Sequence, residues 1–275
     1  MQRGSLVNKI RRLCLSIIVV SASLLAGCGA LMPAMDAEVR QALAPTGKLR
    51  VGVYPGSPTS MIQDPKTGQK VGVTLDLGRE LARQLGVPFE PVEYRRVAEV
   101  VDAMKTGDVD FTFTNASAAR AQVVDFTAPL IALELGYLVP PTSTLFSPAD
   151  IDRAGIKVGV SQGSTSEGVL TREFRNATVV PAASLKAAAE MLTQGKLDAF
   201  ATNKAILFEM SDTLPAFRVL DGRWGLENLA IAIPQGRERG MPYLRQFAAQ
   251  VKAGGLLQSI VEKAGLRGTV QVVSP

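Results

Sequence analysis

A repeated order of strand-like and helix-like segments is the feature that most restricts how this chain can fold. The first series predicts strands at 49–53, 87–92 and 110–114, with helices at 73–85 and from Val97 to Gly107 between them. The second series predicts a strand at 156–160, a helix at 184–194 and a strand at 198–202. Repeated strand–helix–strand units predict an α/β fold with largely parallel sheets covered by helices on both faces.

Two extended apolar stretches, Leu135–Val139 and Leu229–Ile233, lie between these series, and each is followed by proline. We expect them to be crossovers between two lobes, with the C-terminal helices Met241–Ala253 and Leu256–Ala264 returning to the first lobe. The expected boundaries are 47–138 plus 232–275 for lobe 1 and 139–231 for lobe 2. Two independent domains joined by a linker remain the alternative.

The N-terminus has the pattern of an export signal. Four basic residues, Arg3, Lys9, Arg11 and Arg12, precede an apolar stretch from Leu13 to Ala26 that is too short for a stable membrane span. Leu25-Ala26-Gly27-Cys28 resembles the bacterial lipobox. The resemblance implies removal of the signal peptide, residues 1–27, and lipidation of Cys28. A plain signal peptide with a chance cysteine is the alternative.

A lipidated Cys28 would make the protein a lipoprotein held at the membrane on the periplasmic side or at the cell surface. We expect residues 28–46 to form the lipidated N-terminus and a tether. Without residues 1–27, 26 basic residues face 25 acidic ones, a formal charge of +1. No cluster of Lys and Arg interleaved with aromatic residues appears, so we expect no nucleic-acid partner.

The composition excludes several classes of catalyst. The chain has no histidine, which excludes Ser-His-Asp and Cys-His catalysis and histidine metal sites. Its two cysteines, Cys14 and Cys28, lie in the first thirty residues, so no disulfide framework can form in the body of the protein. We expect a monomer that needs no cofactor or metal, in which Asp108, Asp110 and similar residues brace turns.

A series of short segments resembles the polar-amino-acid branch of the bacterial extracellular solute-binding proteins, family 3. Their order and spacing cover about residues 47–268 and include 47–53, 72–77, 85–87, 107–110, 118–130, 159–167 and 195–200. The resemblance implies a two-lobed periplasmic-binding-protein-like fold of type II, with two hinge strands and a ligand cleft between the lobes. It also implies a non-enzymatic substrate-binding component of an ABC importer, with a small carboxylate-bearing solute as ligand and permease and ATPase subunits as partners.

Two segments are the candidates for holding that carboxylate. Arg120 follows a predicted strand, and its guanidinium offers a planar fork of donors that matches a carboxylate. Gly163-Ser164-Thr165 lies between a predicted strand and a helix start, where unpaired backbone N–H groups can bind an anion. In the family, the corresponding residues grip one ligand carboxylate from the two lobes. The alternatives are a surface arginine and simple capping of the helix by Ser164 or Thr165.

The chain departs from the family where the ligand's ammonium is expected. An aspartate usually pairs with the ammonium at the position occupied here by Asn203, which supplies no charge. Tyr54 is the one aromatic residue in the first loop, and Asn115 and Ser117 remain candidate polar contacts. We therefore hypothesise a carboxylate ligand that is not necessarily an α-amino acid, or an amino acid whose ammonium is held by neutral acceptors.

Two other functions stay open at this point. Cyclohexadienyl dehydratases resemble the same family, and Glu167 would be a general acid if it pointed into a dry cleft. Its other interpretation is a first-turn glutamate favoured by the helix dipole. A sensor module of a signalling receptor uses the same lobes, and here it would need a separate partner protein, because the chain stops at Val272–Pro275 with no later apolar span.

Overall fold

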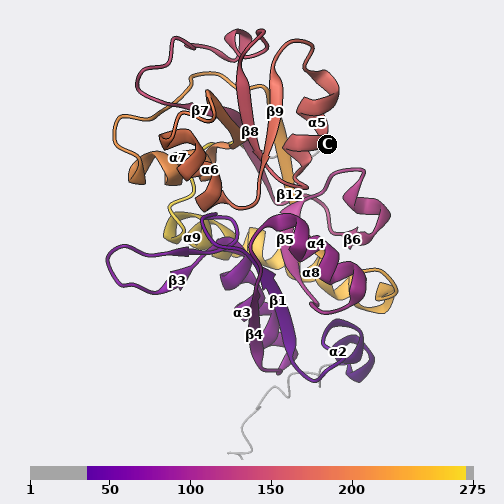
Figure 1. The fold of residues 1–275 in the computed structure, drawn as a ribbon. Coiled ribbons are helices and arrows are strands. Elements are labelled where there is room, and N and C mark those ends of the chain that lie inside the picture. Colours follow the sequence, from indigo (N-terminus) through magenta and orange to yellow (C-terminus); the bar gives the residue numbers. More distant parts are fainter. Residues whose placement is uncertain (1–35, 271–275) are drawn as a thin grey trace, which may run out of the picture. The chain divides into compact units, whose positions relative to one another are not determined.

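The computed structural model describes residues 36–270. The expected signal peptide, residues 1–27, and the expected lipidation site, Cys28, lie outside the described residues. None of the helices in the described range is long and apolar enough to cross a membrane. This part of the chain forms two lobes, which are linked by the long strands β7 (Ile131–Val139) and β12 (Gly225–Pro234) (Figure 1).

Lobe 1 is built around the parallel pair of strands β1 and β4, with β5 joined to β1 through a parallel bridge between Val51 and Phe111. Its elements are α2 (Ala37–Leu43), β1 (Leu49–Val53), β2 (Ile62–Gln63), β3 (Lys70–Val71), α3 (Val73–Leu85), β4 (Phe89–Glu93), α4 (Val97–Thr106), β5 (Thr112–Asn115), η1 (Arg120–Gln122), β6 (Val124–Phe126), η3 (Glu238–Gly240), α8 (Met241–Ala253) and α9 (Leu256–Lys263). The leucines that predict α3, Leu77, Leu81 and Leu85, are all fully buried. Helices α8 and α9 pack into the same core as α3 and β1.

Lobe 2 repeats the arrangement with the parallel strands β10, β8 and β9. Its elements are η2 (Pro148–Asp150), β8 (Lys157–Ser161), α5 (Thr165–Glu173), β9 (Thr178–Ala182), α6 (Leu185–Thr193), β10 (Ala199–Asn203), α7 (Lys204–Thr213) and β11 (Arg218–Val219). Two apolar clusters form its core, one around Tyr137 and Val158 and the other around Phe200 and Leu207. The predicted second series of strands and helices is therefore present.

The two linking strands pair with each other in antiparallel register and join the sheets of both lobes. The order of the main sheet is β5-β12-β7-β10-β8-β9, and β13 (Thr269–Val270) also pairs with β7. These strands are the predicted crossovers, and they begin earlier than expected. Leu133 packs in the core of lobe 1 while Tyr137 packs in that of lobe 2, so the chain changes lobe a few residues before the expected boundary at 138.

The return crossing also differs from the expected boundary. Leu229 and Ile231 on β12 pack in the core of lobe 1, so the expected limit of lobe 2 at residue 231 is too late. The apolar run itself belongs to lobe 1, and the crossing lies in the preceding, more polar part of the strand, at Gly225–Asn228. This shift matters because it puts Glu227 at the junction between the lobes.

The expected tether at residues 28–46 is wrong for its second half. Residues 37–43 form helix α2, which begins after Asp36, whose side chain accepts a hydrogen bond from the N–H of Glu38. Leu43, 1% exposed, packs in the core of lobe 1 and leaves no room for a side chain at Gly240. Burial of this leucine contributes about 1.5–3 kcal/mol to holding the short helix on the lobe.

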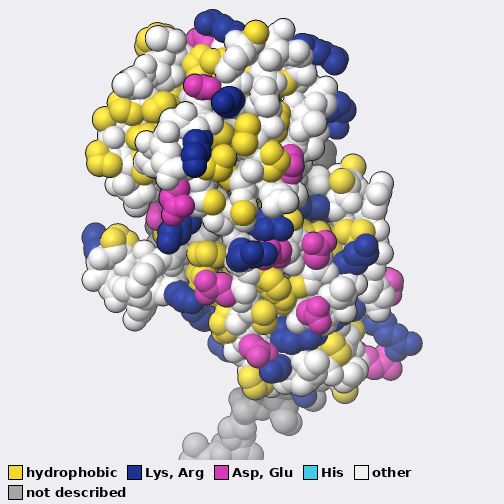
Figure 2. All heavy atoms as spheres, in the orientation of Figure 1, with side chains coloured by type: hydrophobic (Ala, Val, Ile, Leu, Met, Phe, Trp, Pro, Cys, Tyr) yellow, Lys and Arg dark blue, Asp and Glu magenta, His cyan; other side chains and the backbone are white. Residues whose placement is uncertain are grey.

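The charged side chains of the described residues are mixed rather than separated. On the face shown in Figure 2, Lys and Arg side chains lie among Asp and Glu side chains without forming a field of one sign. One carboxylate, Asp110, is fully buried and binds the guanidinium groups of both Arg50 and Arg237 at 2.7 Å. Asp198 accepts the backbone N–H of Lys157 at 2.7 Å. These aspartates brace the turns between strands, and no group of three or more Asp, Glu or Cys side chains in residues 36–270 could hold a metal ion.

Candidate functional site

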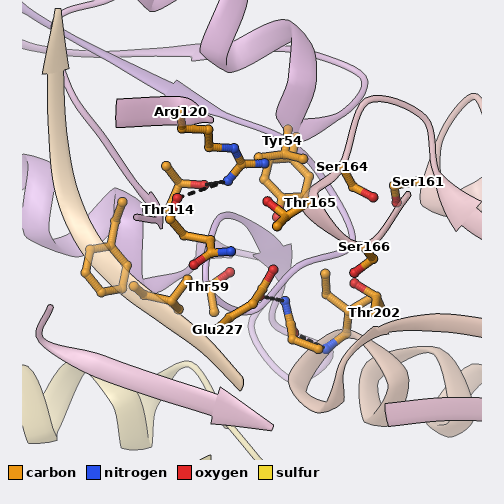
Figure 3. Close-up of a pocket in the computed structure, with 16 residues that line it drawn as sticks. Tyr54, Thr59, Thr114, Arg120, Ser161, Ser164, Thr165, Ser166, Thr202 and Glu227 are labelled. Atoms are coloured by element: carbon orange, nitrogen blue, oxygen red, sulfur yellow. Dashed lines mark hydrogen bonds between the residues drawn. The ribbon is translucent and has the colours of Figure 1, made fainter. Parts of the chain in front are cut away.

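A cavity lies between the two lobes, where residues from both lobes and from a linking strand meet (Figure 3). It is lined by Tyr54, Thr59, Val97, Phe113, Thr114, Asn115, Arg120, Ser161, Ser164, Thr165, Ser166, Thr202, Asn203, Ile206, Glu227 and Leu229. The space open to the centre of a water molecule is about 30 Å³, room for about two waters when each needs roughly 10–15 Å³. A ligand the size of an amino acid therefore enters only when the lobes move apart.

Arg120 is the cationic group of this cavity. It opens the short helix η1 after β5 and is 9% exposed. Its Nη1 donates to the hydroxyl of Thr114 at 2.6 Å and to the carbonyl of Asn115 at 3.5 Å. Both hydrogen bonds that its side chain makes within residues 36–270 use Nη1, so Nε and Nη2 are available to a ligand. The guanidinium is thus fixed on one side and directed into the cavity with the other (Figure 3).

The start of helix α5 brings backbone donors to the same cavity from lobe 2. Ser164 is the N-cap, and its hydroxyl accepts the N–H of Glu167 at 3.1 Å. Ser164, Thr165 and Ser166 all line the cavity. The first N–H groups of a helix have no partner within the helix and carry a partial positive charge. The cap satisfies one of these donors and leaves those of the first turn facing the space that Arg120 also faces.

Glu227 is the anionic group of the cavity, and the sequence analysis did not identify it. It lies on β12, and its carboxylate points toward the same space as Arg120 (Figure 3). The amide of Asn203 donates to its Oε2 at 2.9 Å. Asn203 is also the N-cap of α7, since its Oδ1 accepts the N–H of Ile206 at 3.1 Å. Because Oδ1 is used by the helix, the NH₂ group of Asn203 must face Glu227.

Burial changes the protonation behaviour of both charged groups. It raises the pKa of Glu227, while the charge of Arg120 and the hydrogen bond from Asn203 act in the opposite direction. It also lowers the pKa of Arg120, against the opposing effect of Glu227 and Tyr54. Glu227 is half-buried in the lining of the cavity, and desolvation is the largest influence on its pKa. Each ion is therefore desolvated and only partly compensated by the other.

Contacts across the cleft show that the lobes are closed. Tyr54 of lobe 1 packs against the apolar cluster of lobe 2 that contains Phe200. A Cβ built on Gly163 of lobe 2 would lie 2.6 Å from the Cβ of Ala98 on α4. Arg267, near the C-terminal end of the described range, forms an ion pair with Asp212 on α7. The structure thus represents a closed arrangement of the lobes, more tightly closed than one that holds an amino acid.

The structure brings most of the predicted site residues together around one cavity. Six of them line it: Tyr54, Asn115, Arg120, Ser164, Thr165 and Asn203. Ser117 does not, and its hydroxyl instead accepts the N–H of Arg120 at 3.4 Å. Gly163 does not line it either, because it packs against Ala98 at the edge of the cleft. Direct contact of any of these residues with a ligand stays a prediction.

Glu167, the candidate general acid, lies outside the cavity lining. Its carboxylate accepts the backbone N–H of Gly163 and closes the turn that begins α5. This contact matches the structural interpretation, a first-turn glutamate that supports the helix start. The geometry gives Glu167 no access to an enclosed substrate.

Glu227 was not predicted because it lies outside the apolar run 229–233, which predicts the crossover. One signal was available. In a strand, alternate residues share a face, so Glu227 lies on the same side of β12 as Leu229, which also lines the cavity. An isolated acidic residue in phase with an apolar face is unusual enough to mark a candidate site.

Comparison with known proteins agrees with this arrangement. The model of the bacterial extracellular solute-binding proteins, family 3, matches residues 49–266. The glutamine-binding protein of Geobacillus stearothermophilus is 26% identical over 189 residues, which are 67% of this chain and 72% of that protein. The ABC transporter glutamine-binding protein of Bacillus subtilis (strain 168) is 22% identical over 226 residues, 81% of this chain and 82% of that protein.

Solved structures of amino-acid-binding proteins share the fold. A mutant of ArgBP from T. maritima superposes with a TM-score of 0.74 at 22% identity, covering 82% of this chain and 99% of that one. The ancestral amino acid-binding protein AncCDT-1, a precursor of cyclohexadienyl dehydratase, superposes with a TM-score of 0.71 at 25% identity, covering 82% and 98%. The chain therefore belongs to the bacterial extracellular solute-binding proteins, family 3, has their two-lobed type II fold, and is a relative of the substrate-binding proteins of amino-acid ABC transporters.

Proposed function

We propose that this protein is the substrate-binding component of an ABC importer, and that it captures a small carboxylate-bearing solute between its lobes. The observation that carries the proposal is the buried guanidinium of Arg120, which lines the cavity and whose Nε and Nη2 make no hydrogen bond within residues 36–270. Ser164 and Thr165 line the same cavity from the other lobe. A carboxylate between them would receive a charge-assisted pair of hydrogen bonds from lobe 1 and backbone donors from lobe 2.

A ligand held in this way would favour the closed state. Its carboxylate gains contacts from both lobes only when they come together, and a ligand shifts a conformational equilibrium by its difference in affinity for the two states. The related proteins from Geobacillus and Bacillus are named as glutamine-binding, which supports an amino acid or a related organic anion as the ligand. The closed lobes would then present the loaded protein to a permease and its ATPase, a step that rests on the family relationship.

Isothermal titration of the purified protein against amino acids and simple organic acids tests the capture of a carboxylate. We expect binding of at least one carboxylate, and a loss of more than 100-fold in affinity in Arg120→Ala. Arg120→Lys keeps the charge but lacks the planar fork, so we expect a loss of at least tenfold. Arg172→Lys on the exposed end of α5 is the matched control and should bind as the wild type does. An Arg120→Ala variant with unchanged affinity would rule out this role of Arg120.

Delivery and anchoring are tested in cells. Deletion of the protein should abolish uptake of the ligand found by titration, and unchanged uptake would contradict its role in import.

Lipidation of Cys28 would keep the protein in the membrane fraction, because several acyl chains make a durable anchor. Cys28→Ser should release it into the soluble fraction, and a variant that stays with the membrane would exclude a lipid anchor at this cysteine.

A further inference from the structure

The residues that line the cavity carry equal numbers of positive and negative charges. Of its sixteen lining residues, Arg120 is the one base and Glu227 the one acid. The remaining residues are neutral: hydroxyl and amide side chains such as Thr114, Ser161 and Thr202, and apolar side chains such as Val97 and Phe113. A ligand that fills this cavity therefore meets one fixed positive and one fixed negative charge.

Arg120 is buried and Glu227 is half-buried, and neither charge forms an ion pair within residues 36–270. The side-chain hydrogen bonds of Arg120 go to neutral oxygens of Thr114 and Asn115, and that of Glu227 comes from the neutral amide of Asn203. A buried charge is costly unless it is paired. The molecule that best offsets both costs at once carries one anionic and one cationic group a short distance apart.

We propose, building on the function proposed above, that the ligand is an α-amino acid with a compact, uncharged side chain, and that Glu227 binds its ammonium while Arg120 binds its carboxylate. This replaces the hypothesis that the ammonium has only neutral acceptors, which followed from Asn203 alone. The negative charge is present, but it comes from β12 instead of from the end of β10.

The position of Asn203 beside Glu227 explains why an asparagine accompanies this glutamate. β10 and β12 flank β7, with Asn203 opposite Leu135 and Glu227 opposite Leu133. An aspartate at 203 would still cap α7 with one oxygen, but its other oxygen would then lie against the carboxylate of Glu227. The amide removes that repulsion and donates a hydrogen bond that favours the ionised form of Glu227 and fixes its direction.

The same balance excludes ligands with a further charge. A lysine or arginine side chain would bring a second cation into a lining that holds no second acid, and a glutamate side chain would bring an anion without a second base. Because the closed cavity leaves about 30 Å³ free, the lobes must open further for each atom that a side chain adds, which disfavours bulky aromatic side chains. The ligands that fit are therefore zwitterions with small neutral side chains.

Titration of matched ligand pairs tests this inference without any substitution. The probes are L-alanine, L-serine and L-glutamine, with propionate and glutaramate as analogues that lack the ammonium, and L-arginine, L-glutamate and L-tryptophan as charged or bulky side chains. We expect binding of a neutral amino acid, a loss of at least 100-fold for its analogue without ammonium, and weaker binding of the charged and aromatic amino acids. Glu227→Gln should lose at least tenfold, while Glu173→Gln on the exposed end of α5 should bind as the wild type does, both with an unchanged circular dichroism spectrum.

The outcomes separate this inference from the function on which it rests. If the analogues without ammonium bind as well as the amino acids, or L-arginine or L-glutamate binds most tightly, the zwitterion with a neutral side chain is excluded while a carboxylate-binding function stands. A folded Glu227→Gln variant with wild-type affinity excludes the role of Glu227. If no carboxylate binds at all, the proposed function itself fails.

Discussion

The amide of Asn203 and the carboxylate of Glu227 form a hydrogen bond of 2.9 Å that joins the end of β10 to the hinge strand β12. This bond connects lobe 2 to the junction between the lobes in the lining of the cavity, and it couples the cap of α7 to a half-buried acid. It also changes the meaning of Asn203. Taken alone, the asparagine suggests a site with no charge for an ammonium, but beside Glu227 it belongs to a site in which that charge has a different origin.

Moving the carboxylate from 227 to 203 should restore much of the affinity that is lost with Glu227. Asn203→Asp in a Glu227→Gln background places one acid back in the cavity, with the glutamine amide as its neighbour. We expect this double variant to bind the neutral amino acid at least threefold more tightly than Glu227→Gln alone, measured by isothermal titration. A folded double variant that binds more weakly than Glu227→Gln would contradict the prediction that an acid at position 203 can replace Glu227.

Acidification should weaken binding at a higher pH than for an ordinary glutamate. Only the ionised form of Glu227 attracts an ammonium, and burial raises the pKa of Glu227 above its usual value of about 4.3. The affinity should therefore be full above the raised pKa and fall as the pH drops through it, by up to about tenfold per unit. Arg120 and Tyr54 also face this carboxylate, but both titrate far above this range, and the chain has no histidine.

Titrations from pH 8 to pH 4.5 measure this dependence, with Glu227→Gln as the control. The control should show a much flatter profile, because its residue 227 does not titrate. Parallel profiles in the two proteins would assign the pH dependence to another group.

A methyl group at Gly163 should oppose closure. Its Cβ would lie 2.6 Å from the Cβ of Ala98 in the closed lobes, and a clash that exists only in the closed state lowers the affinity of a ligand that needs closure. We expect Gly163→Ala to lose about tenfold in affinity, which corresponds to about 1.4 kcal/mol. The matched control, Gly168→Ala on α5, meets no atom within 4 Å and should bind as the wild type does.

A second substitution separates closure from backbone strain at Gly163. The φ of Gly163 is +72°, and the strain of an alanine at this φ lowers stability without acting on closure. Ala98→Gly should restore the affinity of Gly163→Ala but not its melting temperature. An affinity that stays low in the double variant would mean that the clash does not control closure.

Loss of the charge at Asp110 should destabilise lobe 1. This carboxylate is fully buried and accepts hydrogen bonds from Arg50 and Arg237. Asp110→Asn leaves two guanidinium groups without their anion, and breaking a buried pair costs about 3–5 kcal/mol. Urea denaturation followed by circular dichroism measures this change. Asp102→Asn on the exposed face of α4 should stay within about 0.5 kcal/mol, and an equally small effect in Asp110→Asn would show that the pair does not stabilise the fold.

The elements that the sequence predicts best have a regular spacing of apolar residues and a residue that clearly marks their end. Helix α3 begins and ends at the expected residues, because its buried leucines recur four apart and Gly86 adopts the left-handed conformation that ends it. Helix α8 also has the expected bounds, Met241–Ala253. Strand β9 was not predicted, since Pro181 argues against a strand. The proline is tolerated because β9 lies at the edge of the sheet and pairs only with β8 among the described strands.

Only part of the candidate site could be predicted, because only part of it is marked by local sequence signals. Arg120 and the turn at Ser164 can be identified locally, since each lies where a strand ends and a helical turn begins. The local sign at Glu227 is only its phase with Leu229 on β12, and its role depends on the register of three strands, β10, β7 and β12, that are far apart in the sequence. Helix α7 was not predicted, because Asn203 was interpreted as a ligand contact. In the structure, Asn203 is also the N-cap of this helix.

The central claim is that Arg120 and the start of α5 hold one carboxylate between the lobes. A crystal structure of the protein with the tightest ligand found by titration tests it most directly. We predict that the ligand carboxylate lies within hydrogen-bond distance of both the Arg120 guanidinium and the backbone N–H of Thr165. A ligand enclosed in the cleft with its carboxylate in contact with neither group would contradict the account.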